Sequence, residues 1–410
     1  MKIGINGYEA VVPRFGFDKE TGLPNRVGSG EFCYQLLSAL SRIDKTNEYS
    51  IFLPLKPTSD MPQESSKWQY VVFHSRKLWT FLGLSRKLKS YKLDVFFSPT
   101  HYLPLITSSP SVIAILDVSY LYFPELFKKK DLYQLKLWGA YAIKKAKKII
   151  TISNSSRNDI IKMYGKKAED VVVVYPGVRE SALSYNVHKV NKVESMNELN
   201  KKFGIRGDYI LFVGTLQPRK NLVRLIEAFS KIRMDANNYS ESTQIKSHSD
   251  GLGQKIRENS ELQLVIVGKK GWSFEEILAA PKKFGVEDKV LFLDSVSDEE
   301  LPFFYKNALC FVLPSLYEGF GLPILEAMQY GCPVATSNVS SLPEAGGDAA
   351  LYFDPENVED IKKNLESIIQ NPELRERLIK KGYEQVKKFS WEKTASQTLS
   401  VLESLVESKK

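Results

Sequence analysis

Cysteine and histidine are scarce in this chain of 410 residues, which contains three cysteines and four histidines. Cys33, Cys310 and Cys332 are odd in number and far apart, which argues against a disulfide framework and against a metal site. We expect them to be buried thiols in a reducing compartment. The four scattered histidines also argue against a structural metal.

Long apolar runs are absent as well. No run approaches the roughly 18 residues that a membrane span needs. Met1 and Lys2 lead directly into IGING, which is too short for the apolar core of a signal peptide. We therefore expect a cytoplasmic protein whose contact with the inner face of a membrane, if it makes one, is peripheral.

Positive charge is in excess, but only in one half of the chain. Residues 1–200 carry 29 Lys and Arg against 18 Asp and Glu, a net +11, whereas residues 201–410 carry 28 against 30, a net −2. Lysines cluster at 128–130, 144–148 and 166–167. One interpretation is a solvated helix face, and the other is a surface that meets anionic lipid or an acidic acceptor. Nucleic acid is disfavoured because no aromatic residues interleave the clusters.

Short, nearly continuous apolar segments alternate with helical patterns in two series, as expected for parallel strands buried on both faces. The expected strands are 2–6, 49–55, 70–74, 95–99, 112–116, 148–153 and 171–175, then 209–214, 262–268, 289–294, 310–314, 333–337 and 350–353. The expected helices are 30–42, 76–90, 131–147, 155–164, 219–232, 273–284, 298–307, 323–330 and 358–369. The alternation predicts an α/β protein with two Rossmann-like domains whose parallel sheets face a central cleft. The polar segment 234–260 is expected to be a long loop.

Two adjacent cations follow the first strand of the second series, in the sequence ILFVGTLQPRKN. We expect a helix to begin at Arg219, which would place Arg219 and Lys220 where the helix macrodipole disfavours cations. A bound anion would compensate for this cost, so the pattern favours a phosphate or diphosphate site. The alternative is a pair of surface cations.

The stretch SLYEGFGLPILEAM, residues 315–328, sets two glutamates on either side of a glycine-rich turn. Gly319 and Gly321 permit a backbone that leaves the N–H groups of residues 320–322 open. Carboxylates accept hydrogen bonds from hydroxyls, so Glu318 and Glu326 suit a sugar or a ribose. We place Glu326 in the first helical turn, where a simpler interpretation is compensation of the helix dipole. That interpretation does not explain Glu318 or the glycines.

The first half of the chain offers candidates at the carboxyl ends of its strands, where ligands of parallel sheets bind. Gly30 lies in a Gly-Ser-Gly segment that opens a helix and could approach a phosphate. Asp117 and Ser153 each follow a strand, and Ser153 could equally be a helix N-cap. His101 lies in the loop of SPTHYLP and is a candidate sugar or acceptor contact, or a bystander.

These segments together resemble glycosyltransferase family 4, whose members are retaining GT-B enzymes that use nucleotide sugars. The resemblance is carried by ILFVGTLQPRKNLVRLIEAF, EGFGLPILEAMQYGCPV and SNVSSLPEAGGDAALYFDPEN, and also by FSPTHYLPL and ISNSSRNDII. It covers nearly the whole chain apart from 234–260. It implies an acceptor-binding domain at 1–185, a donor-binding domain at 205–390 and a C-terminal helix, 391–410, that packs back on the first domain.

The resemblance also implies roles for individual residues. Arg219 and Lys220 match the pair that binds the donor diphosphate, Glu326 matches the acid on the ribose, and Glu318 matches the acid facing the transferred sugar. The implied donor-binding set is Gly30, Arg219, Lys220, Glu318, Phe320, Gly321, Leu322 and Glu326. The implied catalytic set is Glu318, Arg219, Lys220 and Asp117, with no metal or other cofactor. Leu116 stands where many members have a histidine that contacts the donor sugar.

The implied reaction is transfer of a hexose, of mannose or glucose type, from a GDP- or UDP-linked sugar to a glycan or lipid-linked acceptor. The resemblance places this reaction in the synthesis of cell-surface polysaccharide or O-antigen. Two alternatives stay open: a sugar-nucleotide epimerase, and a nucleotide-sugar-binding protein without transfer activity, which Leu116 favours. A dinucleotide oxidoreductase is disfavoured because neither domain has G-x-G-x-x-G directly after its first strand.

Overall fold

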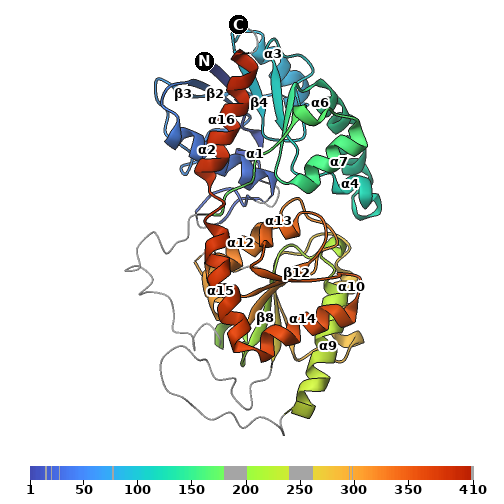
Figure 1. Cartoon of the computed structure of the whole chain (residues 1–410). Coiled ribbons are helices and arrows are strands. Elements are labelled where there is room, and N and C mark those ends of the chain that lie inside the picture. The colour runs from blue at the N-terminus through green and yellow to red at the C-terminus, as the bar shows by residue number, and fades with distance from the viewer. Residues whose placement is uncertain are drawn as a thin grey trace. The chain divides into compact units, whose positions relative to one another are not determined.

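The computed structural model describes residues 1–407 except 14–15, 20, 27, 76–77, 180–200, 240–261, 295 and 298. The chain forms two compact units (Figure 1). The first unit combines Met1–Gly177 with Phe389–Lys410, and the second is Val178–Lys388. Most of the segment 234–260 lies outside the described residues, and its first six residues continue a helix instead of forming a loop.

The first unit contains a parallel seven-stranded sheet in the order β3-β2-β1-β4-β5-β6-β7. Its strands are β1 (Lys2–Asn6), β2 (Glu48–Leu53), β3 (Trp68–Val72), β4 (Val95–Ser98), β5 (Ser111–Ala114), β6 (Lys148–Thr151) and β7 (Val171–Val173). In the central strands Ile5 lies opposite Ile51 and Phe97, and all three side chains are fully buried. The continuous apolar pattern thus reflects burial on both faces, as predicted.

The helices of the first unit lie between its strands, with one exception. They are α1 (Tyr8–Val11), α2 (Ser29–Ile43), the π-helical turn η1 (Trp79–Gly83), α3 (Leu84–Leu88), α4 (Ser119–Tyr122), the short turn η2 (Pro124–Leu126), α5 (Lys129–Gln134), the π-helical turn η3 (Leu135–Gly139), α6 (Ala140–Lys145), α7 (Asn154–Tyr164) and the short turn η4 (Ala168–Asp170). The exception is α16 (Trp391–Glu407), which packs on α2 (Figure 1).

The C-terminal helix α16 is held to the first unit by buried apolar contacts. The rings of Phe32 and Trp391 lie 5.7 Å apart, edge to face. Thr394 donates a 2.7 Å hydrogen bond to the carbonyl of Tyr175. A Cβ on Gly177 would lie 2.2 Å from the backbone nitrogen of Trp391, so only glycine permits this close approach.

The second unit contains a parallel six-stranded sheet in the order β10-β9-β8-β11-β12-β13. Its strands are β8 (Tyr209–Val213), β9 (Gln263–Val267), β10 (Val290–Leu293), β11 (Cys310–Leu313), β12 (Val334–Ser337) and β13 (Ala350–Phe353). Its helices are the single 3₁₀ turn η6 (Pro218–Lys220), α9 (Leu222–Tyr239), α10 (Glu275–Lys283), α11 (Leu301–Asn307), α12 (Leu322–Gln329), α13 (Leu342–Gly346), α14 (Val358–Gln370) and α15 (Pro372–Val386). The predicted fold of two parallel-sheet, Rossmann-like domains is therefore confirmed.

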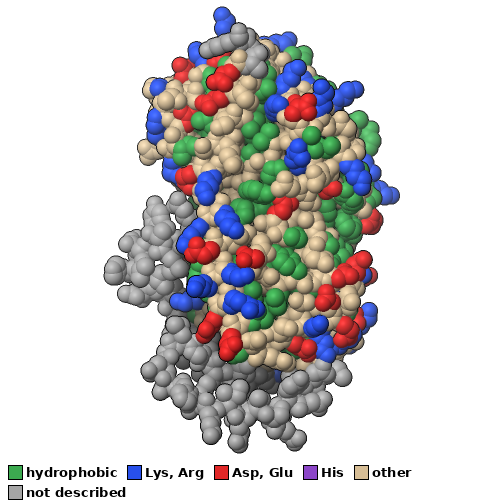
Figure 2. Space-filling view, in the orientation of Figure 1, with side chains coloured by type: hydrophobic (Ala, Val, Ile, Leu, Met, Phe, Trp, Pro, Cys, Tyr) green, Lys and Arg blue, Asp and Glu red, His purple; other side chains and the backbone are tan. Residues whose placement is uncertain are grey.

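Burial and surface composition complete the description of the fold. Cys33, Cys310 and Cys332 are buried free thiols, as predicted, and burial raises the pKa of Cys310 to about 12. Among the described helices, none combines the length and the apolarity that a bilayer crossing requires. Figure 2 shows Lys and Arg side chains gathered with hydrophobic ones over the part of the first unit that carries α3, α6 and α7.

Candidate functional site

The loop after β8 carries the predicted cation pair. Arg219 and Lys220 lie in η6, and Asn221 follows in the left-handed conformation (φ 58°), so α9 begins only at Leu222. The expectation that the cations occupy the first turn of this helix was therefore wrong. The reason is local, because asparagine tolerates this conformation. Its side-chain amide also donates hydrogen bonds to the carbonyls of Pro314 (3.1 Å) and Pro355 (2.7 Å).

Both cations are paired with Glu318, which lies in the loop after β11. Lys220 Nζ lies 2.6 Å from Glu318 Oε1, and Arg219 Nη1 lies 3.1 Å from Glu318 Oε2. The hydroxyl of Ser315 donates a further hydrogen bond of 2.7 Å to Oε1. Arg219 also donates to the carbonyl of Tyr317. The chain's own carboxylate thus offsets part of the positive charge, so the argument that these cations require a bound anion for stability was wrong.

The protonation state of Glu318 follows from this environment. Burial alone would raise the pKa of the carboxyl group, but the charges of Arg219 and Lys220 and the hydrogen bonds outweigh it and lower the pKa to about 2. Glu318 is therefore ionised at neutral pH. It can accept hydrogen bonds there, but it has no proton to donate as a general acid.

Two serines from the segment after β12 hold the Glu318 backbone. The N–H of Glu318 donates to Ser340 Oγ at 2.9 Å, and Ser341 Oγ donates to the carbonyl of Glu318 at 2.8 Å. Ser340 adopts a left-handed backbone (φ 51°), which is uncommon for a residue other than glycine, asparagine or aspartate. Sequence reasoning missed both serines, because a Ser-Ser pair before Leu-Pro is too common a pattern to indicate a site.

The turn between the two glutamates presents backbone donors at the start of α12. Gly321 has φ 107°, and a Cβ there would lie 2.8 Å from Leu342 Cδ2, so both conformation and space require glycine. The N–H groups of Gly321 and Leu322 donate no hydrogen bond to any residue that the structure describes. Phe320 between the loop and the helix is buried. First-turn N–H groups without a partner in the helix are the usual anion-binding groups of helix N-termini.

Glu326 lies in the second turn of α12, because the helix begins at Leu322. Its expected place in the first turn was wrong, because Glu326 is the fifth residue of the helix, and this removes the helix dipole as an explanation for this acid. Tyr305 OH donates a 3.1 Å hydrogen bond to Glu326 Oε2. Tyr305 is fully buried and stacks on Tyr330 with ring centroids 5.9 Å apart. Burial and the nearby carboxylate raise the pKa of Tyr305 well above its ordinary value, so this phenol stays a donor.

Three candidates in the first unit lie at the carboxyl ends of the neighbouring strands β4, β5 and β6. His101 Nε2 lies 3.2 Å from the carbonyl oxygen of Asp117, so the structure brings these two residues together. The Asp117 carboxylate accepts hydrogen bonds from the N–H and the hydroxyl of Ser119 at 2.9 and 2.7 Å, which starts α4. Ser153 is the N-cap of α7, and its hydroxyl accepts a 3.0 Å hydrogen bond from the N–H of Ser156.

Gly30 and Leu116 complete the set of predicted positions. A Cβ on Gly30 would lie 3.0 Å from the carbonyl oxygen of Glu9, so this glycine allows α1 and α2 to approach closely. That packing role needs no ligand. The carbonyl of Leu116 accepts a 3.1 Å hydrogen bond from Ser156 Oγ, which links the end of β5 to the start of α7.

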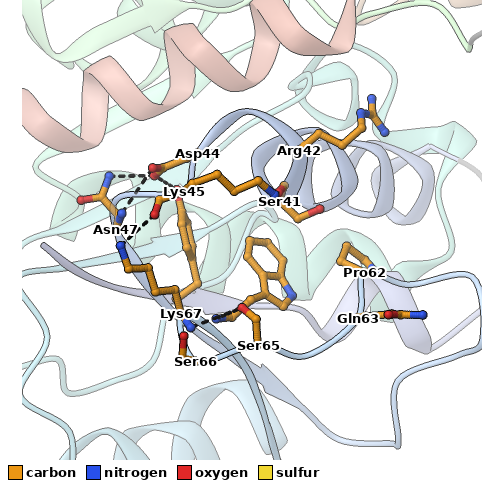
Figure 3. Close-up of a pocket in the computed structure, with 12 residues that line it drawn as sticks. Ser41, Arg42, Asp44, Lys45, Asn47, Pro62, Gln63, Ser65, Ser66 and Lys67 are labelled. Atoms are coloured by element: carbon orange, nitrogen blue, oxygen red, sulfur yellow. Dashed lines mark hydrogen bonds between the residues drawn. The ribbon is translucent and has the colours of Figure 1, made fainter.

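A separate polar pocket of about 390 Å³ lies in the first unit, and none of the predicted site residues lines it (Figure 3). One wall is the turn after α2, where Asp44 accepts hydrogen bonds from Asn47 (2.7 Å), Thr46 (2.7 Å) and Tyr49 (2.6 Å). Burial would raise the pKa of Asp44, but these hydrogen bonds outweigh it and hold the pKa well below its ordinary range. Because the polar groups of this wall already bond to one another, we regard the turn as structural.

The sequence matches two family models, described as Glycosyltransferase Family 4 over residues 28–181 and as Glycosyl transferases group 1 over residues 195–385. O-antigen chain mannosyltransferase B of Escherichia coli is 28% identical over 91% of this chain and 95% of its own length. O-antigen chain mannosyltransferase RfbU of Salmonella typhimurium is 25% identical over 76% and 74%. The crystal structure of Anabaena HepE with UDP and glucose has a TM-score of 0.66 at 16% identity, covering 98% of this chain and 100% of its own, a likeness of fold.

Proposed function

Since this chain belongs to the GT-B glycosyltransferases, with a family model matched in each of its two units, we propose that it transfers a hexose from a nucleotide-diphosphate sugar to a glycan or lipid-linked acceptor. We further propose that the anomeric configuration is retained and that the product is a cell-surface polysaccharide of O-antigen type. Two relatives are named as O-antigen mannosyltransferases, which favours mannose over glucose. The UDP and glucose in the Anabaena relative keep UDP-linked sugars among the donors to test.

The observation that carries this proposal is the cluster of Arg219, Lys220 and Glu318 at the carboxyl ends of β8 and β11. Two cations and one carboxylate leave a net charge of +1 in a site where each side chain is at most 15% exposed. Glu318 keeps the cations from repelling each other when no donor is bound. The cluster is therefore already arranged to attract a diphosphate, and little reorganisation is needed when negative charge develops on it.

The same cluster also supports recognition of a sugar hydroxyl. A carboxylate offers about four acceptor positions. Lys220, Ser315 and Arg219 occupy three positions on Glu318, which leaves capacity for one further donor such as a hydroxyl group. The open N–H groups of Gly321 and Leu322 would donate to sugar or phosphate oxygens. The family resemblance implies the same role for the N–H group of Phe320.

We propose front-face attack as the mechanism. The acceptor oxygen bonds to the anomeric carbon on the side from which the diphosphate departs, and the proton of the acceptor hydroxyl passes to the leaving phosphate oxygen. Arg219 and Lys220 stabilise the charge on the leaving group without a metal ion, while Glu318 stays ionised and orients the sugar. Positioning and electrostatics then lower the barrier, and no protein base is required.

We also propose that the second unit binds the nucleotide and that the first unit contributes contacts to the sugar or the acceptor. Glu326, oriented by Tyr305, would accept hydrogen bonds from the ribose. In the first unit His101 and Asp117, which already contact each other, are proposed contacts for the sugar or the acceptor. Gly30 is proposed to approach the donor diphosphate, in addition to its packing role. Ser153, whose hydroxyl caps α7, is likewise a proposed contact for the sugar or the acceptor.

A thermal-shift panel tests the donor assignment. UDP, GDP and their glucose and mannose derivatives are added to the wild type, Glu326→Ala and Glu326→Gln. Glu376→Ala, an exposed acid on α15, is the matched control. One nucleotide should raise the midpoint of the wild type by mass action, and Glu326→Ala should lose most of this effect while Glu376→Ala keeps it. Glu326→Gln keeps an acceptor for Tyr305, so a loss there too would show that the carboxylate itself binds the ribose. No response of the wild type to any nucleotide would contradict the donor site.

Product analysis tests the reaction and separates the alternatives. The expected product is a glycoside whose anomeric proton coupling matches that of the donor, formed equally well with or without a chelator. A changed sugar nucleotide formed without acceptor would identify an epimerase. Nucleotide binding without any product would support a binding protein that has lost transfer, which Leu116 in place of the family histidine favours.

A further inference from the structure

Large apolar side chains are exposed together on one part of the first unit. Five of them, called here the apolar patch, are Leu78 (49% exposed), Leu82 (39%), Ile106 (56%), Tyr133 (67%) and Leu137 (48%). Single exposed apolar residues are common on proteins, whereas a group on adjoining elements indicates an interaction surface.

The elements that carry the apolar patch are fixed against one another. The ring of Phe81 in η1 lies 4.4 Å from the ring of Trp138 in η3. Tyr141 in α6 donates a 2.9 Å hydrogen bond to the carbonyl of Leu105, next to Ile106. The η1–α3 segment, the segment after β4 and the continuous helix α5–η3–α6 therefore form one surface.

Unpaired cations lie on the same helix, α5–η3–α6, that carries Tyr133 and Leu137 of the apolar patch. Residues 78–148 contain twelve Lys and Arg against four Asp and Glu, a net charge of +8 in a chain whose total is +9. Six of these lysines lie on or at the ends of the helix α5–η3–α6, and their exposed side chains make no hydrogen bond or ion pair to any described residue: Lys128, Lys129, Lys130, Lys136, Lys144 and Lys147. Their charges are solvated and available to an anionic partner.

We propose that this face of the first unit docks on a bilayer that contains anionic phospholipid. The apolar patch would enter the boundary between headgroups and acyl chains, while the lysines contact lipid phosphates. A second copy of this chain is a poor occupant, since a twofold interface would set the same basic face against itself. Docking would hold the chain at the membrane, where a lipid-linked acceptor lies. This consequence for catalysis rests on the proposed function.

Vesicle co-sedimentation at low and high salt tests this proposal. The probes are vesicles of phosphatidylcholine alone and of phosphatidylcholine mixed with phosphatidylglycerol. The charge variant is Lys129→Gln, Lys130→Gln, Lys136→Gln, and the apolar variant is Tyr133→Ser, Leu137→Ser. The wild type should bind the mixed vesicles far more tightly than the neutral ones, and salt should weaken this binding. The charge variant should bind about a hundredfold more weakly, and the apolar variant about tenfold more weakly.

Matched controls come from exposed residues of the second unit. They are the triple variant Lys282→Gln, Lys363→Gln, Lys380→Gln, and Tyr383→Ser, which removes an apolar side chain that is 47% exposed. Both controls should bind vesicles like the wild type. An equal loss in the controls, or equal binding of the wild type to neutral vesicles, would overturn the proposal. It would also be overturned by wild-type dimers in sedimentation velocity that the apolar variant dissociates, because the apolar patch would then belong to a second copy.

The nucleotide thermal shift measured on the same samples separates this proposal from the enzymatic one. Vesicle binding uses no donor, and none of the substituted residues lies in the proposed donor site. If the wild type binds anionic vesicles but no nucleotide, docking stands and the donor assignment falls. If nucleotide stabilises every variant but vesicles bind none of them, the donor assignment stands and docking falls.

Discussion

The two units share one architecture, but they differ in how far their cations are buried and paired. In the second unit Arg219 and Lys220 are nearly buried, and Glu318 holds both within 3.1 Å. In the first unit the side chains of Lys128, Lys129, Lys130, Lys136, Lys144 and Lys147 are exposed and make no hydrogen bond or ion pair to any described residue. A buried cation must be paired, because desolvation would otherwise dominate its free energy, whereas a surface cation needs no partner. The same residue type is therefore buried and paired in one unit and exposed and solvated in the other.

Exposed apolar side chains divide in the same way. Of the large hydrophobic residues exposed in the described chain, Tyr383 belongs to the second unit and the others belong to the first. The second unit thus presents a polar surface around a compact charged site. The first unit presents the surface expected of a protein that meets a large partner. The two units therefore differ in surface chemistry, although both are built on a parallel sheet.

The largest expected effect is on the stability of the first unit alone. Trp391→Ala should lower its free energy of unfolding by about 4 kcal/mol, because it removes a large buried ring that packs on Phe32. The nucleotide-induced thermal shift of the second unit should survive. Unfolding followed by the fluorescence of a probe in each unit would check this. Equal destabilisation of both units would show that they unfold as one.

Glu318→Ala should destabilise the second unit by about 3 kcal/mol, since it leaves two nearly buried cations without their carboxylate. The effect should depend on pH. The folded pKa of Glu318 is about 2, below the ordinary value of roughly 4.3. Its stabilisation is therefore complete above the ordinary pKa and is lost as the pH falls towards 2. Urea unfolding at neutral and at acidic pH should show the gap between wild type and variant narrowing at the acidic pH. A gap independent of pH would contradict the ionised state assigned to Glu318.

Lys220→Met should lower turnover by about a hundredfold, because one of two groups that stabilise the leaving diphosphate is lost. Lys231→Met, at a partly exposed lysine of α9 that pairs with Glu359, is the matched control and should keep wild-type turnover. Vesicle binding should be unchanged in both variants, which would separate the two uses of cations. Wild-type turnover in Lys220→Met would remove this residue from the catalytic set.

Ser341→Ala should have the smallest effect, about 1 kcal/mol, because it removes one hydrogen bond to the Glu318 carbonyl. We expect KM for the donor to rise several-fold with little change in kcat, since the loop loses support but keeps its charges. Ser367→Ala, which removes an exposed hydroxyl that bonds to its own helix, is the control. A fall in kcat alone would indicate that Ser341 acts on the chemical step.

Much of the fold could be predicted from the sequence. Every predicted strand corresponds to a strand of the structure within about three residues at each end, because buried parallel strands leave a continuous apolar run. The helices α1, α4 and α13 were missed, since four or five residues are too few to show a helical repeat. Helix α15 was missed because its sequence, PELRERLIKKGYEQV, is dominated by charged residues.

The candidate site could be predicted from the sequence less completely than the fold. Residue types at strand ends were sufficient to propose Arg219, Lys220 and Glu318 as members of one site. They could not show that Glu318 would pair with both cations, since that pairing joins positions about a hundred residues apart. The helix starts at Leu222 and Leu322 were each misjudged in relation to Arg219 and Glu326, because a left-handed Asn221 and Gly321 decide where the helices begin.

The sequence by itself determined the two parallel sheets, the basic character of the first half and the residue types that suit a sugar nucleotide, because these depend on local pattern and composition. Only the tertiary structure decided which charges are paired, which hydroxyls brace the loop of Glu318, and which apolar residues stay uncovered. The physical reason is that pairing and exposure depend on distance in space. Ser341 and Glu318 meet through neighbouring strands β11 and β12, and Phe81 and Trp138 meet through packed helices, at separations that no local pattern encodes.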